Sequence, residues 1–210
     1  MDPCSQALIG ANLSCSFSNK KDLSKASICG LIGGLSSDLD IFIKSDNDPL
    51  LFLEYHRHFT HSLFFVPVIG LIVSFILYFT FFRKKITFMK VYFFCSLGVL
   101  THGLLDACTS YGTNLYWPFS NSRISWSIIS IIDPVFTSIL ILSFVFCLKL
   151  KSKIISQIGL FFSVIYLIFG LFKHNLVLEF VRNLSSERGH QIERVFLNPT
   201  IGNNILWRSV

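Results

Sequence analysis

The sequence has little charge and none of the cysteine patterns that bind zinc. Of its 210 residues only 14% are charged, whereas 52% are apolar and 23 are Phe. The mean hydropathy of +0.60 argues against a water-soluble domain, because so apolar a chain does not suit a water-facing surface. The six cysteines include no C-x-x-C pair, which argues against a zinc site made of thiolates.

Other common signals are also missing. There is no internal repeat, no low-complexity tract and no glycine-rich phosphate loop. The chain opens with Asp2 where a signal peptide would have its basic region, so no cleavable signal is expected. The net charge of +6 comes from short basic loops, and no nucleic-acid partner is expected.

What the sequence does contain is long apolar runs. Residues 62–82 carry no charge, and a helix of that length crosses a hydrocarbon core of about 30 Å. Further spans are predicted at residues 91–107, 134–148 and 154–172. Two further helices are predicted at residues 3–17 and 24–36, and both are too short and too polar to cross the membrane alone. The predicted fold class is all-α: a polytopic membrane helical bundle of about four long spans plus two shorter packed helices.

Basic residues orient this bundle. Clusters at residues 20–25, 83–90 and 149–153 fall in alternate connections, and the positive-inside rule places them in the cytoplasm. The prediction is a multi-pass protein of the inner (plasma) membrane, with residues 1–173 as the membrane-embedded domain. Residues 174–210 are expected to form an amphipathic, non-cytoplasmic segment, or a plain extension of the last span, and Gly189 would end either helix.

Aspartate and histidine gather at the predicted non-cytoplasmic ends of these helices. Four separated segments supply the candidate metal ligands, which are Asp38, Asp40, His56, His61, His102, Asp106 and Asp133. His102 and Asp106 are four residues apart and share one helix face. Carboxylates are costly inside a membrane, so these groups should face the interior of the bundle.

This mixture of donors indicates a metal site. Imidazole and carboxylate together suit zinc, the favoured ion, with manganese or iron as alternatives, and there are enough ligands for one or two ions. The predicted reaction is hydrolysis by a metal-activated water, with a lipid or lipid-linked phosphate as the substrate and membrane lipids as partners. Arg57, Thr60, Ser62 and Thr109 are expected beside the ligands, the hydroxyls bonding to carboxylates.

Each residue also has a plainer interpretation. Asp38 is typical of a helix end, and Asp133 before Pro134 is typical of a helix N-cap. His102 and Asp106 would also suit a structural hydrogen-bonded pair. His58 is interpreted as an interfacial residue outside the ligand set. Arg57 is interpreted as an interfacial anchor in preference to a phosphate clamp. The convergence of four segments on one layer nevertheless favours a site.

The motifs resemble a known family. The strings that carry the resemblance are Asp38-Leu39-Asp40, "HRHFTHS" at 56–62, "HGLLDACTSYGT" at 102–113, "WPFS" at 117–120 and Ile132-Asp133-Pro134. In this order they resemble the YdjM-type family of membrane-bound metal-dependent hydrolases, from the first residues to the C-terminus. That family is similar to the zinc-dependent phospholipase C and single-strand nuclease superfamily. The resemblance implies a helical fold with Asp and His metal ligands and a phosphoester hydrolase activity.

Two positions depart from the family pattern. Gln6 stands where the resemblance implies a histidine, and an amide is a poor zinc ligand. The segment 198–210 resembles the entrance to an extramembrane domain of longer relatives. These departures keep a second hypothesis open, a non-catalytic structural or regulatory membrane protein with a vestigial or stabilising metal site. A third, a metal or proton transporter, is disfavoured because the charges lie at one end of the bundle.

Overall fold

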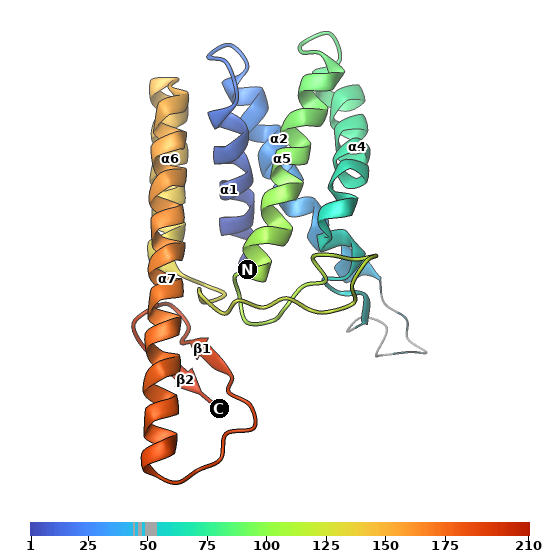
Figure 1. The fold of residues 1–210 in the computed structure, drawn as a ribbon. Helices are drawn as coiled ribbons and strands as arrows, with labels where there is room; N and C mark the ends of the chain where they lie inside the picture. Colours follow the sequence, from blue (N-terminus) through green and yellow to red (C-terminus); the bar gives the residue numbers. More distant parts are fainter. Residues whose placement is uncertain (44, 46–47, 49–53) are drawn as a thin grey trace.

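The computed structural model is mostly helical and describes residues 1–43, 45, 48 and 54–210 (Figure 1). The elements are α1 (Pro3–Ser16), α2 (Leu23–Ser36), the 3-10 turns η1 (Ser37–Phe42), η2 (Phe59–His61) and η3 (Leu63–Phe65), α4 (Val66–Leu77), the π-helical turn η4 (Tyr78–Phe82), α5 (Phe88–Ala107), α6 (Pro134–Leu150), α7 (Lys153–Glu187), β1 (Leu197–Pro199) and β2 (Trp207–Ser209).

The membrane prediction is confirmed in its coarse form. Three helical segments are long and apolar enough to cross a membrane: Leu63–Phe82, Phe88–Ala107 and Lys153–Glu187. The fourth expected span, α6, is apolar but shorter, at 17 residues, so the structure has three candidate spans where about four were expected. The two short helices α1 and α2 pack on each other and on α5, as predicted.

The helices alternate in direction, which separates the two ends of the bundle. The connections α1–α2, η4–α5 and α6–α7 lie together at the top of Figure 1, and the N-terminus and the end of α5 lie at the other end. The three basic clusters of the sequence therefore share one end. The Asp and His residues of η1, η2 and the last turns of α5 lie at the opposite end.

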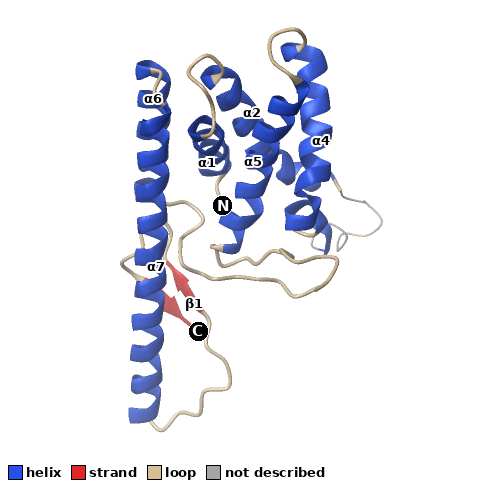
Figure 2. Ribbon diagram, turned by 45° about the horizontal axis from the view of Figure 1, so that its top comes forward, coloured by secondary structure: helices blue, strands red, loops and turns tan. Residues whose placement is uncertain are grey.

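The C-terminal segment continues from α7 without a break. At 1.5 Å per residue, the 35 residues of α7 extend about 52 Å, well beyond a hydrocarbon core of about 30 Å. The helix ends at Glu187, and Gly189 two residues later has a positive φ of 68°, as expected of a helix stop. The antiparallel pair β1–β2 then folds back beside α7 (Figure 2). Asn204 Nδ2 ties it to Ile128 O at 3.0 Å.

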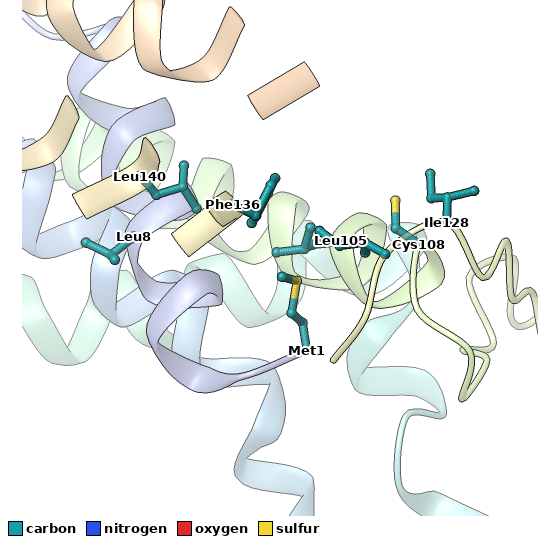
Figure 3. Packing of buried hydrophobic residues seen from close by; sticks show 8 residues of the cluster. Met1, Leu8, Leu105, Cys108, Ile128, Phe136 and Leu140 are labelled. Carbon is teal, nitrogen blue, oxygen red and sulfur yellow. The ribbon is translucent and has the colours of Figure 1, made fainter. Parts of the chain in front are cut away.

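A hydrophobic cluster joins α1, α5, α6 and the 108–133 segment (Figure 3). Its buried members are Met1, Leu8, Leu105, Cys108, Ile128, Ile129, Phe136 and Leu140. Leu105 lies immediately before Asp106, so packing of this cluster fixes the end of α5 from which the functional residues project. A second cluster, with Val73, Phe94 and Cys95 among its members, packs α2 and α4 against α5.

Candidate metal centre

Four side chains converge at the lower end of α5. Asp38 comes from η1, His61 from η2, and His102 and Asp106 from successive turns of α5. One ligand atom from each residue lies within 4.8 Å of the other three. His61, His102 and Asp106 are buried, while the Asp38 side chain is 26% exposed and forms the open side of the group.

The separations between these atoms match a shared ion. His61 Nε2 lies 2.9 Å from His102 Nε2, 3.3 Å from Asp106 Oδ2 and 3.5 Å from Asp38 Oδ1. His102 Nε2 lies 3.2 Å from Asp38 Oδ1 and 4.0 Å from Asp106 Oδ2. Tetrahedral zinc with bonds of about 2.0–2.1 Å separates its ligand atoms by about 3.3–3.4 Å. The observed distances bracket that value.

Both imidazoles are oriented by bonds from their other nitrogen. His102 Nδ1 lies 2.6 Å from the carbonyl oxygen of Gly34; a carbonyl only accepts, so Nδ1 carries the hydrogen. His61 Nδ1 lies 3.0 Å from Thr60 Oγ1 and 3.4 Å from Asp40 Oδ2. Thr60 already donates its hydroxyl hydrogen to Asp40 at 2.7 Å, so His61 Nδ1 is also the donor. In the neutral rings both Nε2 lone pairs therefore face the group.

Asp40 supports the group without joining it. Its Oδ2 accepts from the Arg57 backbone N–H at 2.9 Å and from Thr60, and its Oδ1 accepts from His56 Nδ1 at 2.9 Å. Both oxygens are therefore occupied by donors. Asp40 orients His61 and holds the 56–60 segment, and His56 lies on the outer side of this carboxylate.

Gln6 and Met1 occupy one side of Asp106. Gln6 Nε2 donates to Asp106 Oδ1 at 2.9 Å and lies 3.3 Å from His102 Nε2. The α-amino group of Met1 also donates to Oδ1. Asp106 Oδ2 and Gln6 Oε1, both buried, have no hydrogen-bond donor among the residues that the structure describes. These two acceptor oxygens lie beside the Nε2 atoms of His61 and His102, and such a set of oxygen and nitrogen atoms could hold a cation.

The pKa shifts of Asp38, Asp40 and His61, which lie outside the spans, also indicate a site that attracts positive charge. Burial by itself raises the pKa of Asp38, but hydrogen bonds from His102 and His61 outweigh it and hold the pKa well below its usual range. Burial also raises the pKa of Asp40, but its interaction with His61 outweighs burial and leaves the pKa at about 2. Burial lowers the pKa of His61, but Asp106, Asp38 and Asp40 raise it to about 10. The carboxylates therefore attract positive charge, either a proton on His61 or a metal ion.

Two glycines allow the helices to approach closely enough to form the group. A Cβ on Gly103 would collide with the backbone oxygen of His61, and one on Gly34 would collide with that of Gln6. Gly103 follows His102 directly, so α5 can lie against η2. Sequence reasoning did not single out either glycine, because a glycine within a helix carries no local signal of what approaches it.

Asp133 does not join the group. Its Oδ1 accepts from the N–H groups of Val135 and Phe136, both at 3.1 Å, and Tyr166 donates to its Oδ2 at 2.8 Å. The expectation that Asp133 acts as a ligand is thus replaced by the plainer interpretation, an N-cap of α6. Pro134 in the first turn strengthens that helix start.

Other predicted residues have roles that differ from expectation. Ser62 Oγ donates to the Trp117 carbonyl, and Thr109 Oγ1 donates to the Asp106 carbonyl at 2.8 Å, so neither hydroxyl bonds to a carboxylate. His58 packs against Trp117, with ring centroids 5.4 Å apart, and remains outside the ligand group. The Met1 amine was not foreseen, because no sequence pattern marks a terminal amine as a partner.

Arg57 is not an interfacial anchor. It is only 9% exposed, and its Nε lies 3.3 Å from Asp106 Oδ2. Its guanidinium carbon lies 5.0 Å from the ring centroid of Tyr111. The preferred interpretation from the sequence was wrong, because the fold turns this side chain inward toward the ligand group.

Comparisons with known proteins agree with the motifs. The uncharacterized protein YfhP of Bacillus subtilis (strain 168) is 26% identical over 181 residues, which are 83% of this chain and 52% of that protein. The chain thus spans about half the length of this curated relative. No solved structure matches it. The model of the YdjM inner membrane protein family matches residues 1–177, not the whole chain. The match includes every residue of the Asp/His group, and this chain belongs to the YdjM inner membrane protein family.

Proposed function

We propose that this protein is a membrane-bound, metal-dependent hydrolase that acts on phosphoester bonds of a lipid or lipid-linked substrate. The observation that carries the proposal is the pair of Nε2 atoms of His61 and His102, 2.9 Å apart and flanked by Asp38 and Asp106. Nε2 atoms this close share a positive species, either the proton that His61 carries without metal or a metal ion that both rings coordinate. Asp106 Oδ2, which makes no hydrogen bond among the described residues and lies 3.3 Å from His61 Nε2, fits the same ion.

Asp38, His61, His102 and Asp106 would hold the ion. Two nitrogen and two oxygen donors suit zinc first, with manganese or iron as alternatives. A divalent ion supplies Lewis acidity and lowers the pKa of a water ligand towards 7, which is what hydrolysis at neutral pH requires. One ion is the simpler assignment, because the oxygens of Asp40 are already occupied by donors.

The protein residues around the ion have separate tasks. The Gly34 carbonyl and Asp40 keep the two imidazoles in the tautomer that directs Nε2 inward. Gln6 and Met1 hold one oxygen of Asp106 and leave the other free. Asp38 lies on the exposed side, where a substrate would arrive.

The position of the site supports a lipid substrate. His61 precedes the span Leu63–Phe82 directly, and Asp106 lies at the end of the span Phe88–Ala107. Both positions are at the end of the hydrocarbon core, the depth of the phosphate groups of lipids. The basic loops lie at the other end of the bundle (Figure 1), and by the positive-inside rule this supports a site on the non-cytoplasmic side.

Metal content is the first test. Detergent-purified protein is expected to contain about one equivalent of zinc or manganese by mass spectrometry, and the double variant His102→Ala/Asp106→Ala should contain none. The matched control is Glu179→Ala/His190→Ala, which removes one acidic residue and one histidine from the exposed C-terminal region. Absence of metal in the wild type after attempted reconstitution would exclude the proposal.

Activity is the second test. The metal-loaded protein should hydrolyse at least one member of a panel of phospholipids and lipid pyrophosphates, and the double variant none. A fully loaded protein that leaves the whole panel intact would contradict the hydrolase proposal and favour a metal that only stabilises the bundle.

A further inference from the structure

The backbone of Arg57 is held in an unusual conformation beside the metal-binding group. Its φ is +62°, in the left-handed region that residues with a Cβ rarely adopt. Its N–H donates to Asp40 Oδ2 at 2.9 Å, and its carbonyl accepts from the Asn114 N–H at 3.1 Å. The same carboxylate that orients His61 therefore also holds the backbone of Arg57. The position of its guanidinium is tied to that of the metal ligands.

The guanidinium is buried but incompletely paired. Arg57 is 91% buried, as its 9% exposure implies, and its Nη1 has no hydrogen-bond acceptor among the described residues. One face lies over the Tyr111 ring, a favourable but non-directional contact. A buried N–H of a charged group without an acceptor is costly. A ligand with a negatively charged oxygen would remove that cost.

The guanidinium of Arg57 lies at the edge of the proposed ion site. Asp106 Oδ2 is 3.3 Å from Arg57 Nε and 3.3 Å from His61 Nε2, so a single oxygen atom separates the guanidinium from the ligand nitrogens. Asp38 and Tyr111 at this side are partly exposed, 26% for the Asp38 side chain and 63% for Tyr111. An anion entering here meets the ion and the arginine together.

We infer that Arg57 binds the substrate, with Nη1 donating to a non-bridging oxygen of a phosphoryl group while another oxygen of the same group faces the metal-binding atoms. A phosphoryl group fits because its several oxygens can engage an arginine fork and a cation at once. The inference rests on the proposed function and assigns the recognition of its substrate to one residue. Tyr111 supports the guanidinium from the outer side.

The test measures anion binding at known metal occupancy. Wild type, Arg57→Gln, Arg57→Lys and the control Arg182→Gln, which removes an exposed arginine of α7, are loaded with metal and titrated calorimetrically with inorganic phosphate, short-chain phosphatidic acid and acetate. Phosphate and phosphatidic acid should bind about 10- to 100-fold more weakly to Arg57→Gln, the size expected for one charge-assisted hydrogen bond. Arg57→Lys should lie between, and Arg182→Gln should match the wild type. Tighter binding of phosphatidic acid than of phosphate would identify a lipid source.

The other outcomes are distinguishable. Unchanged phosphate affinity in a metal-loaded Arg57→Gln protein would overturn the inference and leave the proposed function intact, as would acetate binding as tightly as phosphate. Loss of metal from Arg57→Gln would assign Arg57 to positioning Asp106 and would also overturn it. Failure of the wild type to load any ion would overturn the proposed function, and the inference with it.

Discussion

Asp106 lies in the last turn of α5 and Asp133 is the N-cap of α6, and both are fully buried, at 0% exposure. Asp133 receives two backbone N–H groups and the Tyr166 hydroxyl, so donors occupy both of its oxygens. Asp106 Oδ2 makes no hydrogen bond within the described part of the chain and lies 3.3 Å from both Arg57 Nε and His61 Nε2. The two carboxylates differ in the number of donors that reach them. A buried carboxylate with all its bonds made stabilises a helix end, whereas one with an open oxygen beside imidazole nitrogens can bind an ion.

Metal content should distinguish the roles of the two carboxylates most clearly. Asp106→Asn should abolish metal retention, because an amide is a weak ligand for zinc and brings no negative charge. Asp133→Asn should retain the wild-type stoichiometry. Mass spectrometry of the two purified variants makes the comparison, and equal metal loss in both would remove the distinction drawn between them.

Lower pH should weaken metal binding at the group that contains Asp106, and Asp133 should play no part in this effect. Without metal, His61 has a raised pKa of about 10, so it is protonated at neutral pH and an ion must displace that proton. Below pH 10 the metal affinity should therefore rise about tenfold per pH unit, or about 100-fold between pH 6 and pH 8. Competition with a chelating dye measures this slope in wild type and in Asp133→Asn. A pH-independent affinity would show that His61 is not a ligand.

Removing the support of His61 should weaken the site without destroying it. Asp40→Asn leaves all four ligands in place but removes the charge near His61 Nδ1, and loss of such a partner typically lowers metal affinity about 10- to 100-fold. Dye competition should place this variant between wild type and Asp106→Asn. An affinity as low as that of Asp106→Asn would instead make Asp40 a ligand.

Changes at Asp133 should lower the stability of the fold and leave metal binding unchanged. Asp133→Ala removes the N-cap of α6 and should lower the free energy of unfolding by about 1–2 kcal/mol. Tyr166→Phe removes one hydrogen bond to the same carboxylate and should cost about 0.5–1.5 kcal/mol. Thermal unfolding in detergent tests both, with metal content as the control. Loss of metal in Tyr166→Phe would connect Asp133 to the ion site after all.

Much of this organisation was predictable from local patterns. The apolar runs predicted the spans, and the spacing of His102 and Asp106 placed both on one helix face. The dipeptide Asp133-Pro134 carried the correct N-cap interpretation beside the ligand interpretation, and nothing local distinguished them. The choice depended on Tyr166, which is 33 residues away. Arg57 was misjudged for a similar reason, since its neighbours Asp106 and Tyr111 lie far along the chain.

By itself, the sequence determined that the chain enters a membrane, where most of its helices begin, and that acidic and imidazole groups gather at one end of the bundle. These follow from hydrophobicity, helix periodicity and capping, which act over a few residues. Only the tertiary structure decided which of those groups meet, because Gly34 lets α2 approach α1 and Gly103 lets α5 approach η2. The number of hydrogen-bond donors that reach a buried carboxylate depends on distant parts of the chain. No local sequence pattern encodes that number.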